Sequence, residues 1–222
     1  MAGSPESRLG QPTAGSLHDV AREKIKARIL AGEFAAGAPL SEELIAAELK
    51  MSRTPVRQAF QELVSAGLLE RVPGRGVVVS RIDLHHVLDI FEVQQCLLEW
   101  AVERLCQHPG VDLAVVLEAY CRQLEAVERN DFAAVRSHAR RMDVALVAAT
   151  GNREMERYMR GISDLLLHAA SQALATRDVY EEAISEHGEI IDAIQACDVE
   201  RAKRATRVHF EGMLRRLGGQ RR

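Results

Sequence analysis

The stretch that decides the fold covers residues 51–79 and reads MSRTPVRQAFQELVSAGLLERVPGRGVVV. Ser52 is a good N-cap and Pro55 is tolerated in the first helical turn, so a helix is expected to begin here. The pattern then changes, because β-like runs at 68–72 and 77–80 flank the turn residues 73–76. A short helix followed directly by a β-hairpin is therefore predicted.

Two further helices are predicted upstream of this stretch. Residues 17–30 repeat an apolar side chain every fourth position, which indicates an amphipathic helix. Ser41 can cap a second helix through about Leu49, with Leu44, Ile45 and Leu49 facing inward. Three helices followed by a hairpin form the winged helix-turn-helix plan, in which the third helix reads DNA.

The remainder of the chain is expected to be a bundle of helices. Its pattern is helical almost to the end, with turn residues that divide residues 83–217 into about six helices. The predicted fold class is therefore mainly α, and three parts are expected: a flexible tail at 1–14, a winged helix-turn-helix domain at 15–81 and an all-helical sensor and dimerisation domain at 82–218.

Composition narrows the class of protein. The 222 residues are 47% hydrophobic and 27% charged, as in ordinary globular proteins, and 4% aromatic, which suits helices packed through aliphatic side chains. The four cysteines form no C-x-x-C pair, so neither a disulfide framework nor a zinc knuckle is expected. No apolar run reaches the roughly 18 residues that a membrane span needs. We expect a cytoplasmic protein without a membrane partner.

The net charge of −3 argues against a nucleic-acid partner for the chain as a whole. Residues 50–76, however, contain five basic and two acidic residues. A local basic surface on an otherwise acidic protein is sufficient to face the phosphates of DNA.

The start of the third helix carries the strongest chemical signal. Hydroxyl groups, free backbone N–H groups and the helix dipole all favour phosphate there, and an arginine one turn later can reach a base edge. A capped, solvated helix start is the alternative, but the glycine and arginine at the hairpin tip favour DNA binding. The expected DNA contacts are Ser52, Arg53, Thr54, Arg57, Arg75 and Gly76.

These residues resemble the GntR family of bacterial regulators. The resemblance is carried by 40–42, 51–60, 67–68 and 75–76, where residue type and spacing agree. It implies that Arg53, Thr54 and Arg57 contact operator DNA, and that the wing at Gly76 enters the minor groove.

Two positions depart from this family pattern. Glu43 stands where many members carry an arginine that touches DNA, and Gln58 replaces a common glutamate. The operator sequence is therefore not carried over from the family.

The C-terminal half is similar to the FCD-type sensor domain of the FadR subfamily over nearly all of residues 83–217. The similarity is carried by Glu92-Val93 with Glu99, Asp143 followed by Gly151-Asn152, Glu186-His187, the run 192–194 and His209. Metal-binding members of that group place one aspartate and three histidines around a divalent ion, commonly zinc or nickel. The ion then helps to hold a small carboxylate effector.

Asp143, His187 and His209 match three of the four ligand positions, and Val147 takes the fourth. Three ligands can still bind zinc when water or an effector oxygen completes the shell. The alternative is that the two histidines are hydrogen-bonded core residues. His168 is a further candidate for the effector cavity, with an ordinary surface or core histidine as the alternative.

Gln94 is the second departure in this half, since many relatives carry an arginine there. An amide cannot form a bidentate charged clamp on a carboxylate, so the effector is expected to be less acidic or held differently. Alternatively, position 94 faces the dimer seam. The predicted effector-binding set is Gln94, Val147 and His168.

The resemblance implies a homodimeric regulator that responds to a small metabolite and binds a palindromic operator, acting as a repressor as most relatives do. Two alternatives stay open. One is a constitutive DNA-binding regulator with a degenerate sensor. The other is a metal-dependent hydrolase, which is disfavoured because no nucleophile or general base accompanies the three candidate ligands. The chain is not expected to be an enzyme.

Overall fold

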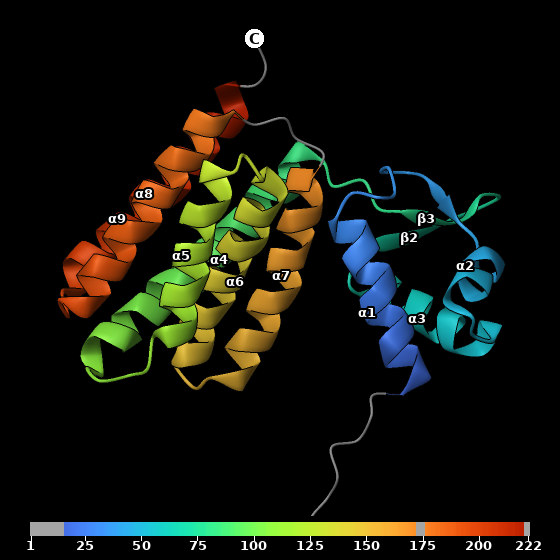
Figure 1. Cartoon of the computed structure of the whole chain (residues 1–222), viewed down its shortest axis with the longest axis horizontal. Helices are drawn as coiled ribbons and strands as arrows, with labels where there is room; N and C mark the ends of the chain where they lie inside the picture. The colour runs from blue at the N-terminus through green and yellow to red at the C-terminus, as the bar shows by residue number, and fades with distance from the viewer. Residues whose placement is uncertain (1–15, 172–175, 220–222) are drawn as a thin grey trace, which may run out of the picture.

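The computed structural model describes residues 16–171 and 176–219, which form an N-terminal region (residues 16–80) and a helical bundle (residues 84–219) (Figure 1). The N-terminal region contains α1 (Leu17–Leu30), β1 (Pro39–Leu40), α2 (Glu42–Leu49), α3 (Arg53–Ser65), β2 (Leu69–Val72) and β3 (Gly76–Val79). The bundle contains α4 (Leu84–Gln107), α5 (Ala114–Glu128), α6 (Phe132–Ala149), α7 (Arg153–Ser171), α8 (Arg177–Gln195) and α9 (Val199–Gly219). The predicted fold class is confirmed; the tail predicted at residues 1–14 lies outside the described residues.

The N-terminal region is held together by α1 packed across α3. Ile25, Ile29 and Phe60 are fully buried between them. One expectation is wrong: Leu44 is 66% exposed, because α2 turns Ile45 and Ala46 inward instead.

The sheet is antiparallel and has the order β1-β3-β2. The predicted hairpin is present, with Val72 opposite Gly76 at its tip. Strand β1 was not predicted, since its two residues lie in a loop too short to show any period. It pairs with β3 through Pro39 and Leu40, which ties the loop after α1 to the hairpin.

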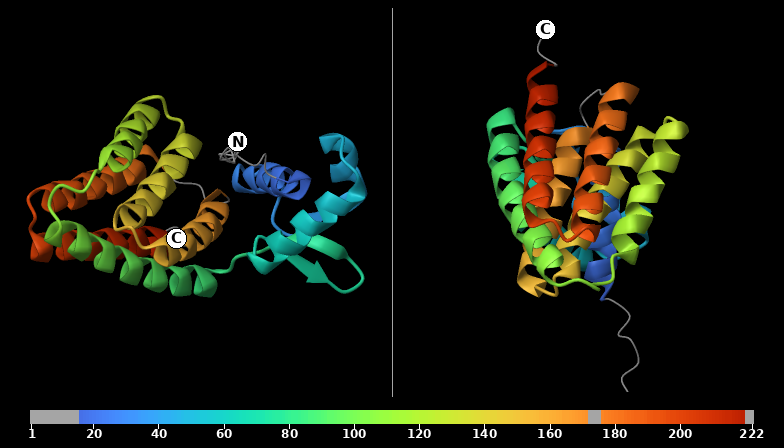
Figure 2. Two further views of the ribbon diagram at one scale, coloured as in Figure 1. Left: turned by 90° about the horizontal axis from the view of Figure 1, so that it is seen from below. Right: turned by 90° about the vertical axis from the view of Figure 1, so that its left-hand side faces the viewer.

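The six helices of the bundle run alongside one another (Figure 2). Aliphatic side chains fill the core, among them Leu98, Val102, Met142 and Leu146, and Phe91 meets Phe210 edge-to-face with ring centroids 6.1 Å apart. None of the helices within residues 16–171 and 176–219 is long and apolar enough to cross a membrane.

Helix α7 of the bundle packs against the N-terminal region, and α1 and α7 face each other in Figure 1. Leu165 of α7 packs against the hydrophobic cluster of the N-terminal region. The fully buried His168, one turn further along, has its Nε2 atom 2.9 Å from the carbonyl oxygen of Ser80. This helix therefore belongs to the bundle and also forms the surface on which the N-terminal region docks.

Candidate DNA-binding surface and effector cavity

The N-terminal end of α3 is exposed and has no side-chain cap. Ser52 occupies the N-cap position but makes no capping hydrogen bond through its side chain, and Arg53 and Thr54 are exposed. Pro55 and Val56 are buried, which fixes the face that α3 presents to solvent. The free hydroxyls and the first N–H groups of the helix can therefore meet a phosphate.

Arg57 lies one turn along on the exposed side of α3. Its side chain is 56% exposed, and its Nε atom donates a hydrogen bond of 3.1 Å to Oε2 of Glu42. One exposed ion pair contributes little stability, so DNA can displace it at small cost. Glu43 on α2 is also exposed. A side chain at this position can influence how DNA is read only if it is exposed, and Glu43 meets that condition.

The wing presents Arg75 and two glycines at its tip. Gly74 and Gly76 have φ angles of 75° and 77°, a conformation in which other residues are strained. Within the described part of the chain, the one hydrogen bond that the guanidinium of Arg75 donates is a long one, 3.5 Å to the carbonyl oxygen of Gly37. The predicted DNA contacts therefore occupy two exposed places, the start of α3 and the tip of the wing.

The bundle contains a partly open cavity of about 410 Å³ between α4, α5, α6, α7, α8 and α9. Most of its wall is apolar; the side chains with polar groups that line it are Gln94, Gln123, Arg136, Arg140, Asp143, Ser163, Tyr180, His187, His209 and Arg216. Four predicted site residues lie in this wall, namely Gln94, Asp143, His187 and His209. The other two lie elsewhere: Val147 is fully buried in the hydrophobic core, and His168 contacts Ser80.

His187 and His209 face each other through their Nε2 atoms, which are 3.3 Å apart. Each Nδ1 atom is hydrogen-bonded at 2.8 Å, to Oε1 of Gln123 for His187 and to Oε2 of Glu186 for His209. Both partners are acceptors, so each Nδ1 carries a proton and donates it. The two Nε2 atoms therefore point at a common space, and their approach is favourable only with a proton or a metal cation between them.

Charged groups hold this pair in place. Burial alone would raise the pKa of Glu186, but hydrogen bonds from His209 and Arg216 bring it below its usual value. Burial lowers the pKa of His187 well below its ordinary value, and the neighbouring charges of His209 and Arg216 act in the same direction. His187 is thus neutral near pH 7 and able to act as a ligand.

Asp143 lies in the same cavity wall but is hydrogen-bonded to a residue other than the two histidines. Its Oδ2 atom accepts a 2.7 Å hydrogen bond from Nε2 of Gln94. Burial raises its pKa to about 7, against smaller lowering effects of Gln94 and Arg140. Asp143, His187 and His209 do not all bring a ligand atom within 4.8 Å of one another. The residues therefore fit a metal through two imidazoles, with Asp143 outside the converged pair.

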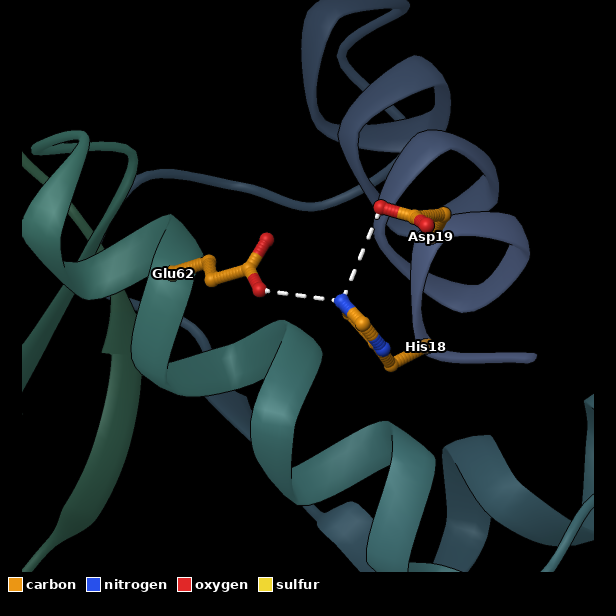
Figure 3. Close-up of side chains that lie close together, drawn as sticks. All are labelled: His18, Asp19 and Glu62. Carbon is orange, nitrogen blue, oxygen red and sulfur yellow. Dashed lines mark ion pairs between the residues drawn. The ribbon is translucent and has the colours of Figure 1, made fainter. Parts of the chain in front are cut away.

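A different trio meets that distance condition among the described residues: His18, Asp19 and Glu62, at the junction of α1 and α3 (Figure 3). His18 Nε2 lies 3.3 Å from Glu62 and 3.6 Å from Asp19. Arg22 also lies there, with Nη1 2.7 Å from Glu62 and 3.3 Å from Asp19. Since the guanidinium of Arg22 already pairs with both carboxylates, this trio is better described as part of an ion-pair network between two helices.

Sequence reasoning missed several polar residues of the cavity. Arg136 and Arg140 stand one turn apart on α6, and Asp143 follows on the same face, so helical spacing alone could have grouped them. Gln123 carried no signal, because a buried glutamine inside an amphipathic helix looks like any solvated one.

Comparison with known proteins agrees with both halves of the structure. Residues 17–79 match the family model "Bacterial regulatory proteins, gntR family", and residues 89–212 match the model "FCD domain". The chain belongs to the GntR family of bacterial regulatory proteins and carries an FCD domain. It is a DNA-binding transcriptional regulator and not an enzyme.

Two relatives carry the word repressor in their names. The chain is 29% identical over 212 residues to the "Probable D-xylose utilization operon transcriptional repressor" of Paenarthrobacter nicotinovorans, covering 93% of this chain and 90% of that protein. It is 32% identical over 113 residues to the gluconate operon transcriptional repressor of Bacillus subtilis, covering 49% and 46%.

Solved structures show the same fold. A GntR regulator from Rhodococcus sp. RHA1 superposes with a TM-score of 0.84 at 23% identity, over 93% of this chain and 100% of that one. Escherichia coli McbR/YncC superposes with a TM-score of 0.80 at 22% identity, over 93% and 99%.

Proposed function

We propose that this regulator is a cytoplasmic homodimeric repressor of the FadR subfamily, which binds a palindromic operator and responds to a small metabolite in its bundle cavity. The observation that carries the proposal is the pairing of two features in one chain. An exposed, uncapped start of α3 beside an exposed wing is suited to DNA, and the mainly apolar cavity of about 410 Å³, with a few polar side chains in its wall, is suited to a small molecule. The repressor names of both relatives support the direction of control.

We propose further that one divalent metal, zinc in preference to nickel, is held by Nε2 of His187 and of His209. Two Zn–N bonds of about 2.0–2.1 Å at a tetrahedral angle place the nitrogens roughly 3.3–3.4 Å apart. The observed separation is 3.3 Å. Gln123 and Glu186 hold the two Nδ1–H groups, as outer partners of metal-bound histidines do. A bound zinc would offer open coordination positions to an oxygen atom of the effector.

Selection of duplexes from random-sequence DNA by the full chain tests the regulator. We expect two inverted half-sites whose centres lie about one helical turn apart, or a multiple of it, and sedimentation of two chains per bound duplex. Enrichment of single half-sites bound by one chain would contradict the dimeric operator model. Failure to enrich any sequence would contradict specific DNA binding.

Titration of the chelator-treated protein with zinc, followed by calorimetry, tests the metal. We expect one zinc per chain, with affinity lost in His209→Ala and kept in His85→Ala, a control in which an exposed histidine of α4 is removed. Equal affinity in both variants would place the metal elsewhere. No binding at all would favour a regulator with a degenerate sensor, consistent with the separation of Asp143 from the two histidines.

A further inference from the structure

Among the described residues, one arginine of the cavity wall pairs with no carboxylate. Arg216 is balanced by Glu182 at 3.1 Å and Glu186 at 2.9 Å. Arg136 is not: its Nη1 donates a 2.7 Å hydrogen bond to the hydroxyl of Tyr180, and no carboxylate of the described residues pairs with it. The wall therefore contains a cation on α6 that is available to an anion.

Further polar atoms in the wall also lack partners. The Nε atoms of Arg136 and Arg140 are buried, and no hydrogen-bond acceptor in the described structure reaches them. Gln94 is only 3% exposed, and no donor among the described residues reaches its Oε1 atom. Buried polar groups without partners are costly in a native protein, so their clustering in one cavity points to a polar ligand that satisfies them.

Arg140 is paired with a carboxylate that also binds the N-terminal region. Asp164 of α7 is 5% exposed, and its Oδ1 forms an ion pair with Nη2 of Arg140. Its Oδ2 lies 2.5 Å from Nζ of Lys26 on α1. A single buried carboxylate thus links the cavity wall to the N-terminal region through two cations.

The neighbours of Asp164 make the same connection. Leu165 packs into the hydrophobic cluster of the N-terminal region and reaches Gly67, where a Cβ atom would lie 3.3 Å from Leu165 Cδ2. Ser163 and Leu166 line the cavity on the other side of the helix. A ligand that moves the cavity side of α7 would therefore also move the side on which the N-terminal region packs.

We propose that the cavity takes a ligand with an apolar body and one anionic group, which binds Arg136 and Arg140 and draws Arg140 away from Asp164. This inference rests on the proposed function and names the ligand class and the regulation of its cavity. A buried carboxylate that loses one of its two cations is destabilised in its buried position. Asp164 then leaves its site, and the contact of α1 with α7 loosens. The N-terminal region can then move more freely relative to the bundle.

The ligand class is tested with matched acids and amides: hexanoate, cyclohexanecarboxylate and benzoate, each against its uncharged amide, with a chelator present so that metal cannot hold the acid. We expect at least one acid to bind at least tenfold more tightly than its amide, by calorimetry on the full chain. Arg136→Gln should lower the affinity for the acid by about 10- to 100-fold, as expected for the loss of a charge-assisted hydrogen bond, and leave the affinity for the amide unchanged.

Arg141→Gln is the control for this experiment, because Arg141 is exposed on the same helix and pairs with Glu118. Thermal unfolding without ligand checks that each variant folds, and Arg136→Lys, which keeps the charge, should recover part of the affinity. Equal affinity for acid and amide, failure of every acid to bind, or an unchanged affinity in Arg136→Gln would overturn the anion site.

The link to the N-terminal region is tested by amide hydrogen exchange of residues 17–30 in the full chain. We expect the bound acid to speed exchange several-fold in the parent. Lys26→Gln should show the faster exchange without the acid and gain nothing from it. Lys24→Gln, in which an exposed lysine of the same helix is changed, should behave as the parent.

Unchanged exchange in the parent, or a full response in Lys26→Gln, would overturn the link. Neither experiment contains DNA, so their failure is separable from failure of the regulator. A chain that selects an operator but gives these negative results would remain a regulator without this connection.

Discussion

At the scale of single residues, the two cavity histidines are defined by what holds their Nδ1 atoms. Gln123 and Glu186 accept those protons, and both Nε2 atoms are thereby turned toward one another. The family resemblance located both histidines, since they stand in recognisable motifs. It could not locate Gln123, nor show that Gln94 binds Asp143, because those contacts depend on how α4, α5 and α6 approach one another.

Asp143→Asn should change how stability depends on pH in the metal-free protein. The pKa of Asp143 is raised from 3.8 to about 7 by burial, so the folded state holds this proton more tightly than the unfolded state does. The resulting stabilisation is fully present below about pH 4 and is lost as pH rises through about 7. As pH rises across that window, the free energy of unfolding of the parent should therefore fall relative to that of Asp143→Asn, by up to about 1.4 kcal/mol per pH unit.

Urea unfolding of both proteins at several pH values, with a chelator present, measures this shift. His187, whose lowered pKa weakens the fold as pH falls below 6.5, acts alike in both proteins and cancels in the difference. A difference that stays flat between pH 4 and 7 would mean that Asp143 is ionised throughout.

At the scale of elements, the spacing of apolar residues in the sequence was sufficient to predict the helices and the hairpin. It failed where the signal was short or shifted: β1 has two residues, and α2 rotates so that Leu44 is exposed while Ala46 is buried. Neither outcome follows from local pattern, because both depend on what the loop and α2 meet when they pack.

The wing depends on a backbone conformation that favours glycine at position 76. Gly76 has a φ of 77°, and no atom of the described residues lies within 4 Å of the place where a Cβ would stand, so Gly76→Ala carries a conformational cost without a clash. We expect a loss of about 1–2 kcal/mol in the free energy of unfolding. Urea denaturation of the variant measures it.

Gly161→Ala is the matched comparison. It lies on α7 with equal open space around it but with helical backbone, so alanine should stabilise the protein by about 0.5–1 kcal/mol. Equal stability of the two variants would show that the hairpin tip relaxes to a conformation that alanine accepts.

At the scale of the whole molecule, a winged helix-turn-helix is joined to an FCD bundle through α7, with Asp164, Leu165 and His168 forming the contact. The sequence indicated both halves and the approximate place where they meet. The contact itself was not predictable, because Lys26 and Asp164 are far apart along the chain and each looks like an ordinary surface charge.

The most direct measurement of the central claim is the affinity of Arg57→Ala for the selected operator at fixed salt concentration. Arg57 is exposed on α3 and, among the described residues, pairs only with Glu42, so its removal should leave the fold intact. We expect binding to weaken by about 5- to 150-fold, corresponding to about 1–3 kcal/mol for a base contact. Arg141→Ala, on the distant bundle, should bind as the parent does. Parental affinity in a folded Arg57→Ala protein would contradict the assignment of α3 as the helix that reads DNA.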